Sequence, residues 1–283
     1  MMHVISCETH VVPGPGNCAI DVYRPVSGSL RAAVVLLHGG AWVEGDRSAM
    51  APYAQILAEQ GFTAFAVQYR LSSQALWPAQ LIDVRAAINW IAKASGQFGI
   101  DPARIALQGF SAGGHLALMA AGAALPEVPL TVRPGAVVAL FAPPVLKLPP
   151  PAAGPVPPRL LLGPDAGDAE AIAASPLTHI DPGFPPTFLL NGTGDPLVTH
   201  DDALVLFNRL MAAGVAVDLH LFAGQTHEFS ELPRMLPVVQ SAVAAFLDRA
   251  MIDPAGYQAD NLRLNRFADP EFLRAIASPA APQ

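Results

Sequence analysis

The chain alternates between short, continuously apolar segments and longer segments whose apolar residues recur at helical intervals. Segments of the first kind, such as Ala32–Leu37, are typical of strands covered on both faces of a sheet. Segments of the second kind, such as Ala79–Ala94, gather Leu, Val and Ile on one side of a helix. Strands that alternate with helices in this way over about 220 residues predict right-handed crossovers and a mostly parallel central sheet with helices on both faces.

The apolar segments give the bounds of the expected elements. The predicted strands are Met2–His10 and Asn17–Tyr23, which form an antiparallel pair, and then Ala32–Leu37, Thr63–Gln68, Arg104–Gln108, Ala136–Phe141, Thr187–Asn191 and Val217–Phe222. The predicted helices are Met50–Gln60, Ala79–Ala94, Ala112–Ala123, Asp201–Ala213 and Leu236–Met251.

Two segments depart from this alternation. The Pro-rich segment Pro143–Pro158 is incompatible with a regular helix or a central strand, so we expect an extended loop over the carboxyl end of the sheet. After Ile252 the apolar clusters are short, and Asp269 followed by Pro270 predicts one short helix through Ile276. We therefore predict one α/β domain over residues 1–250 and a C-terminal tail over residues 251–283.

Composition excludes several classes of function. With 52% hydrophobic and 14% charged residues, the chain can bury a large core. A net charge of −7 without a basic cluster argues against nucleic-acid and membrane-surface partners. The N-terminus lacks the features of a signal peptide and no apolar run reaches about 18 residues, so a cytoplasmic protein is expected. Cys7 and Cys18 are expected to be free thiols.

A serine lies among small residues in the stretch Gly109-Phe110-Ser111-Ala112-Gly113-Gly114. The stretch falls between a predicted strand and a predicted helix. A strand that turns abruptly into a helix holds its turn residue at positive φ and presses the flanking residues together, which requires glycine there. The serine hydroxyl then stands free at the carboxyl end of the sheet, where α/β proteins bind ligands. Ser111 is therefore the candidate nucleophile.

A serine nucleophile needs donors for the oxyanion that forms on the carbonyl it attacks. His38-Gly39-Gly40-Ala41-Trp42 follows a predicted strand, again at its carboxyl end. Its glycines allow the backbone to approach the substrate. We expect the N–H groups of Gly39, Gly40 and Ala112 to form the oxyanion hole.

The base is sought among eight histidines. His227 stands in a loop just after the last predicted strand, from which it can reach a serine at the same edge, whereas His200 is its nearest competitor. Asp195 ends a glycine-rich turn after another strand and precedes His227. The order Ser111, Asp195, His227 is the chain order of α/β-hydrolase triads. Asp201 and Asp202 are better interpreted as residues that cap the following helix.

The motifs together resemble those of α/β-hydrolase carboxylesterases, in particular the hormone-sensitive-lipase-like and acetyl-esterase-like group. The resemblance covers about residues 17–250 and rests on an ordered series, which comprises HGGAW, QYRL, WPAQ with Asp83, FGIDP, GFSAGGHLA, SP at 175–176, GTGDPLV and the loop around His227. It implies the α/β-hydrolase fold, the triad Ser111–Asp195–His227 and an oxyanion hole at Gly39, Gly40 and Ala112. Too few residues precede His38 for a full helical cap, so little or no cap is expected.

The expected activity is hydrolysis of short-chain carboxylic esters through an acyl-enzyme on Ser111. Trp42, Phe110 and Trp77 are candidate walls of the substrate pocket. The sequence offers no HExxH motif or carboxylate–histidine cluster, so neither a metal nor another cofactor is expected. Two alternatives stay open, namely an arylformamidase or other amidase with the same triad, and a non-catalytic binding module. The Pro-rich loop and the tail could roof the pocket or meet a second subunit, as in a homodimer.

Overall fold

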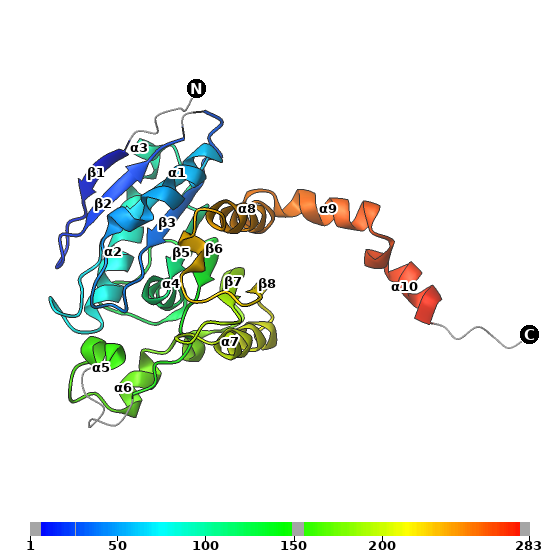
Figure 1. The fold of residues 1–283 in the computed structure, drawn as a ribbon. Helices are drawn as coiled ribbons and strands as arrows, with labels where there is room; N and C mark the ends of the chain where they lie inside the picture. Colours follow the sequence, from blue (N-terminus) through cyan, green and yellow to red (C-terminus); the bar gives the residue numbers. More distant parts are fainter. Residues whose placement is uncertain (1–6, 26, 149–155, 278–283) are drawn as a thin grey trace, which may run out of the picture.

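An eight-stranded sheet, with helices on both of its faces, forms the body of the protein (Figure 1). The computed structural model describes residues 7–25, 27–148 and 156–277. The strands are β1 (Cys7–Val11), β2 (Ala19–Tyr23), β3 (Ala33–Leu37), β4 (Thr63–Val67), β5 (Ile105–Phe110), β6 (Ala136–Leu140), β7 (Thr187–Gly192) and β8 (Val217–Phe222).

The strands lie in the order β1-β2-β4-β3-β5-β6-β7-β8. Strand β2 pairs antiparallel with both of its neighbours, and every pair from β4 to β8 is parallel. The carboxyl ends of β3 and β5 to β8 therefore meet at one edge of the sheet. This is the edge where loops that carry functional side chains gather in open α/β sheets.

The helices form one layer on each side of the sheet. The main helices are α1 (Ala51–Glu59), α2 (Ala79–Lys93), α3 (Ser95–Phe98), α4 (Ala112–Gly122), α7 (His200–Ala212) and α8 (Leu236–Leu247). Helices α1 and α8 share a core cluster with one face of the sheet, and α2, α4 and α7 share a second cluster with the other face. Strands β3 to β6 are buried along their whole length because both faces are covered.

The α/β fold and mixed sheet expected from the sequence are confirmed. Each predicted strand and helix corresponds to an observed one, with ends that mostly differ by one or two residues. Residues 2–6 of the first predicted strand lie outside the described residues. Cys7 and Cys18 are free thiols, as predicted. Among the described residues, no helix is both long and apolar enough to span a membrane.

The connection between β6 and β7 departs from the prediction. The extended loop expected over 143–158 continues only to residue 148 in the described part, since 149–155 lie outside it. Pro157 and Pro158 instead begin helix α5 (Pro157–Leu162), which is followed by α6 (Asp168–Ala173) and a 3₁₀ turn (Pro176–His179). The first helical turn tolerates proline because its N–H groups have no partner within the helix.

The C-terminal tail also differs from expectation. Helix α10 (Pro270–Ala277) lies where the sequence predicted it, and the Asp269 carboxylate accepts a hydrogen bond from the N–H of Glu271 at 2.9 Å. The prediction of a single helix was wrong, because α9 (Pro254–Leu264) precedes it. No residue of α9 is buried, so it lacks the apolar stripe by which helices are recognised in a sequence.

Candidate active site

Ser111 forms a sharp turn between β5 and α4. Its φ of 52° and ψ of −115° are sterically unfavourable for a residue with a side chain, as the sequence predicted for this position. A Cβ on Gly109 would collide with the carbonyl of Gly113, and a Cβ on Gly113 would collide with the carbonyls of Leu37 and His38. The two glycines therefore allow the tight turn that leaves the serine hydroxyl at the carboxyl edge of the sheet.

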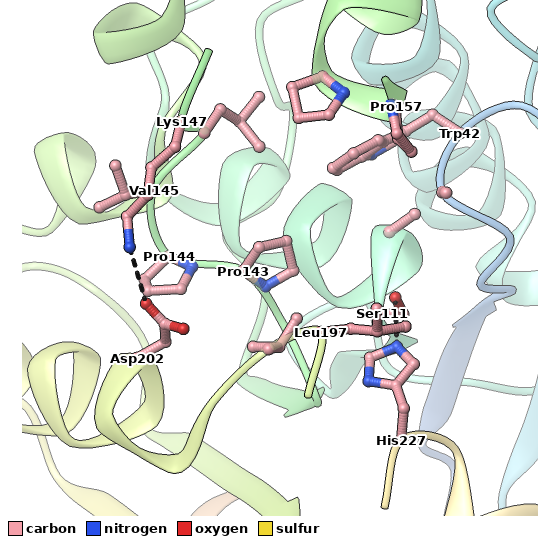
Figure 2. A pocket seen from close by; sticks show the side chains of 15 residues that line it. Trp42, Ser111, Pro143, Pro144, Val145, Lys147, Pro157, Leu197, Asp202 and His227 are labelled. Atoms are coloured by element: carbon pink, nitrogen blue, oxygen red, sulfur yellow. Dashed lines mark hydrogen bonds and ion pairs between the residues drawn. The ribbon is translucent and has the colours of Figure 1, made fainter. Parts of the chain in front are cut away.

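His227 lies in the loop after β8 and faces this hydroxyl. The distance from its Nε2 to the Oγ of Ser111 is 2.9 Å, and the distance from its Nδ1 to the Oδ2 of Asp195 is 2.7 Å. Figure 2 shows the imidazole beside the Ser111 hydroxyl at the end of the cavity. Three side chains separated by up to 116 positions in the chain thus form one hydrogen-bonded series.

Asp195 is held in a buried turn after β7. The second oxygen of its carboxylate, Oδ1, accepts hydrogen bonds from the N–H groups of Leu197 at 2.8 Å and Val198 at 3.0 Å. Its side chain is fully buried, and that of His227 is 12% exposed. Because the carboxylate accepts the Nδ1 proton, Nε2 carries the free lone pair. That nitrogen can take a proton from the Ser111 hydroxyl.

The loop His38–Trp42 lies beside the serine and is fixed by a buried tyrosine. The hydroxyl of Tyr69 donates to the carbonyl of His38 at 2.8 Å, and its ring stacks on the His38 ring with centroids 4.2 Å apart. The Nδ1 of His38 lies 2.7 Å from the carbonyl of Gly39, to which it donates. Burial lowers the pKa of His38, so the neutral ring suits this role as a clamp on its own loop.

The amide groups expected to form an oxyanion hole lie close to Ser111. A Cβ on Gly39 would stand 3.6 Å from the Cβ of Ser111. The N–H groups of Gly39, Gly40 and Ala112 donate to no described residue. Ala41 was not singled out from the sequence, yet it lines the cavity beside Ser111, and its N–H is likewise without a described acceptor. The sequence does not reveal that Ala41 has a positive φ of 53°, because alanine seldom adopts that conformation.

A cavity of about 300 Å³ opens beside the serine. Most of its walls are apolar, and four prolines contribute to them (Figure 2). The apolar lining residues include Trp42, Pro143, Leu146, Pro157, Pro158 and Leu197. The wall therefore comes from both ends of the Pro-rich segment and from the turn after Asp195. Lys147 and Asp202 form an ion pair at the cavity with Nζ and Oδ1 3.7 Å apart.

Of the three residues predicted to line the pocket, one lines the cavity and two do not. Trp42 lines it. Phe110 does not, because the last residue of β5 directs its side chain to the α1 face, where its ring lies 4.4 Å from that of Tyr53. Trp77 does not line the cavity either and packs against His115 with ring centroids 5.6 Å apart. Assigning Phe110 and Trp77 to the pocket wall was therefore wrong.

His115 supports the cavity from behind. It lies one turn after Ser111 on α4 and is fully buried, with its ring 5.1 Å from that of Trp42. Its Nε2 donates to the carbonyl of Ala174 at 2.7 Å, which joins the serine helix to the segment between β6 and β7. Burial lowers the pKa of His115 to about 4.

The competing polar residues do not join the hydrogen-bonded series of Ser111, His227 and Asp195. His200 begins α7 and faces Asp201, with 3.6 Å between Nε2 and Oδ1. The Asp202 carboxylate accepts the N–H of Thr199 at 3.0 Å, as expected of a residue that caps a helix. Within the described ranges, no group of three or more His, Cys, Asp or Glu residues could hold a metal ion.

The chain is similar in sequence to known esterases. The profile of the family described as BD-FAE matches residues 20–210. Esterase LipU of Mycobacterium tuberculosis is 32% identical over 234 residues, which cover 75% of this chain and 75% of that protein. Ethyl acetate hydrolase of Pseudomonas putida is 28% identical over 247 residues, 79% of this chain and 74% of that protein.

Solved structures show the same fold. The propionate-bound structure of the Est2 esterase from Thermogutta terrifontis superimposes with a TM-score of 0.74 at 26% identity, over 85% of this chain and 93% of that one. Other relatives are longer. The chain spans 48% of the carboxylic ester hydrolase LipM and 62% of the esterase LipQ, both of M. tuberculosis.

Proposed function

The chain belongs to the BD-FAE family, and we propose that it is a carboxylesterase that cleaves short-chain carboxylic esters through an acyl-enzyme on Ser111. The observation that carries the proposal is the hydrogen-bonded series from the Ser111 hydroxyl through His227 to Asp195. The names of its relatives support the class of reaction, since they include esterases and an ethyl acetate hydrolase.

In this mechanism the Oγ of Ser111 attacks the ester carbonyl while the Nε2 of His227 takes the hydroxyl proton. Asp195 keeps the Nδ1 proton in place and stabilises the imidazolium that forms. The tetrahedral intermediate collapses as His227 returns the proton to the leaving alcohol oxygen. Water, deprotonated by the same imidazole, then hydrolyses the acyl-serine ester and releases the acid.

The negative charge of the tetrahedral intermediate needs hydrogen-bond donors. We assign this role to the N–H groups of Gly39, Gly40 and Ala112, and add that of Ala41 because it lines the cavity with Ser111. The position of Ala112 as the first residue of α4 supports its inclusion, because the dipole of that helix favours negative charge there.

The cavity supports a small, largely apolar substrate. Its volume of about 300 Å³ admits a short acyl or alkoxy group. The Est2 esterase of T. terrifontis, a protein of the same fold, has been solved with propionate bound, which is a ligand of that size. A cytoplasmic location and a homodimer stay predictions of the sequence.

The first test compares the wild-type protein with Ser111→Ala on p-nitrophenyl esters of rising acyl length, with N-formylkynurenine as the amide-type comparison. We expect activity on acetate to butyrate esters and a loss of at least about 10⁴-fold in kcat for Ser111→Ala. Ser73→Ala, at an exposed loop position, is the matched control and should keep full activity. A folded Ser111→Ala protein that retains substantial turnover would rule out the nucleophile.

Paraoxon provides a second readout that does not depend on the choice of ester. Esterase 2 of T. terrifontis has been solved phosphorylated by paraoxon. We expect paraoxon to transfer one diethylphosphoryl group to the peptide that contains Ser111, as read by mass spectrometry. Preference for N-formylkynurenine over every ester, with the same labelling, would instead assign the protein as an amidase.

A further inference from the structure

The C-terminal residues 254–277 form an arm that leaves the body of the protein. Helix α8 continues through a π-helical turn at Asp248–Ile252 into α9, and a turn at Arg266–Ala268 leads to α10. Figure 1 shows the arm in orange and red, extending from α8 away from the sheet and its helices. We call residues 254–277 the arm.

The arm exposes large apolar side chains that no described part of the chain covers. Six of them are between 43% and 69% exposed, and they are Tyr257, Leu262, Leu264, Phe267, Leu273 and Ile276. Helix α9 has 11 residues and α10 has 8. Isolated helices shorter than about 12–15 residues are marginal in water, so helices this short need a surface to pack on.

The net charge of the arm indicates which kind of surface it can pack on. The arm carries three acidic residues and three arginines, so its formal net charge is zero; they are Asp260, Asp269, Glu271, Arg263, Arg266 and Arg274. A segment that binds a nucleic acid or an anionic membrane carries an excess of positive charge, which the arm lacks. The arm therefore suits a protein surface better than a nucleic acid or an anionic membrane.

The body of the chain also exposes apolar residues, at the end of the sheet formed by β8 and on the helices beside it. Leu221 on β8, Met211 and Val205 on α7, and Val238 on α8 are between 40% and 54% exposed. Each copy thus carries an apolar arm and an uncovered apolar surface. A twofold assembly of two such copies can cover both arms in one closed contact.

The exposed apolar area of the arm favours a symmetric dimer over a complex in which a single arm binds another protein. Half of a large apolar side chain is on the order of 100 Å², so six of them amount to about 600 Å² for one arm. One arm on a foreign partner would bury about 1,200 Å² in total, the lower limit for a stable contact. In a symmetric pair each arm can pack on the body of the other copy, and two such contacts would bury about 2,400 Å², which is ample for a stable dimer.

From these observations we propose that the arm is the dimerisation element of the protein, and that a second copy of this chain covers its apolar side chains. The arm lies outside residues 20–210, the part that matches the family profile. The proposal is independent of the catalytic one, because none of the described residues that line the active-site cavity belongs to the arm.

The test measures molar mass by light scattering and sedimentation, over about a hundredfold range of concentration, for the full chain. We expect the wild-type chain to be a dimer. The double substitution Leu273→Asp with Ile276→Asp buries two unpaired charges if the dimer forms, and should weaken dimerisation by about a hundredfold or more. Both side chains are exposed within one copy, so the folded body should be unaffected, as thermal unfolding and circular dichroism will show.

Gln258→Asp is the matched control, because it adds a charge to an exposed polar position of α9 and should leave the dimer intact. A wild-type chain that is monomeric over the whole range would overturn the proposal. So would a doubly substituted chain that dimerises as tightly as the wild type.

Discussion

At the scale of single residues, the buried His115 links the stability of the protein to pH. Exclusion from water lowers the pKa of its imidazole to about 4 from the usual 6.5, although the hydrogen bond to Ala174 opposes the shift. Between those two values the unfolded chain binds the proton and the folded protein does not. The free energy of unfolding therefore falls as the pH is lowered through that range, and this contribution is constant above it.

The prediction is a difference between two pH profiles. On going from pH 7 to pH 5, the wild-type protein should lose about 2 kcal/mol more of its unfolding free energy than His115→Leu does. Urea denaturation at each pH measures this. His200→Leu, at a side chain that is 42% exposed, is the control and should follow the wild-type profile. Parallel profiles for the wild-type protein and His115→Leu would contradict the assignment.

The chemical role of a residue could be predicted from the sequence where a motif requires that residue type. Ser111 lies between two glycines that the tight turn requires, and His227 and Asp195 lie in loops after strands, from which they can reach it. The structure brings the three side chains within hydrogen-bond distance. The direction of Phe110 depends on which residue of β5 faces which helix layer, and the motif does not contain that information.

At the scale of elements, an ion pair fixes the connection between β4 and α2. The Asp83 carboxylate is 1% exposed and accepts from the Nε and Nη2 of Arg70, both at 2.8 Å, and from the backbone N–H of Arg70 at 2.9 Å. The arginine follows β4 and the aspartate lies in α2. The pair therefore holds α2 against the segment after β4, which also carries Tyr69, the residue that donates to the carbonyl of His38.

Removing one partner should leave a buried charge without compensation. Arg70→Ala is expected to lower the unfolding free energy by about 3 kcal/mol or more. Arg24→Ala is the control, since Arg24 pairs with Glu8 at 2.7 Å on the surface and should contribute less than about 1 kcal/mol. Chemical denaturation of both variants provides the comparison, and equal small losses would show that the Arg70–Asp83 pair does not hold α2.

Elements could be predicted where burial leaves a periodic pattern. Strands β3 to β6 are apolar along their length because they are covered on both sides, and the sequence located them within one or two residues. Helix α5 begins with two prolines, where the sequence predicts a loop, because proline breaks the interior of a helix but is accepted in its first turn. Helix α9 buries nothing within one copy and so carries no apolar stripe.

At the scale of the whole molecule, the size of the cavity should set the acyl length that the proposed esterase accepts. Leu146 lines the cavity, is 4% exposed, and is held by the hydrogen bond from its N–H to the Oγ of Ser175 at 2.8 Å. Leu146→Ala lengthens the space available to the acyl group. We expect the ratio of kcat/KM for octanoate to that for acetate to rise about tenfold.

Leu197→Ala is the matched control, because Leu197 lines the same cavity but is 73% exposed at its mouth. It should leave that ratio close to the wild-type value. An unchanged ratio in Leu146→Ala would mean that the acyl group lies elsewhere.

The layered architecture could be predicted from strands that alternate with helices. The position of the arm could not, because α9 buries no residue against the rest of the described chain.

Most of the walls and the reacting groups have separate origins in the chain. Prolines 143, 144, 157 and 158 and Leu146 belong to the connection between β6 and β7, whereas Ser111, Asp195 and His227 follow other strands. The connection is joined to α4 by the hydrogen bond from His115 to Ala174, and its residues Leu161 and Ala174 share a core cluster with that helix. Replacing this one stretch with that of another esterase should therefore graft a new substrate range onto an unaltered reaction centre, which is a simple route for divergence among such enzymes.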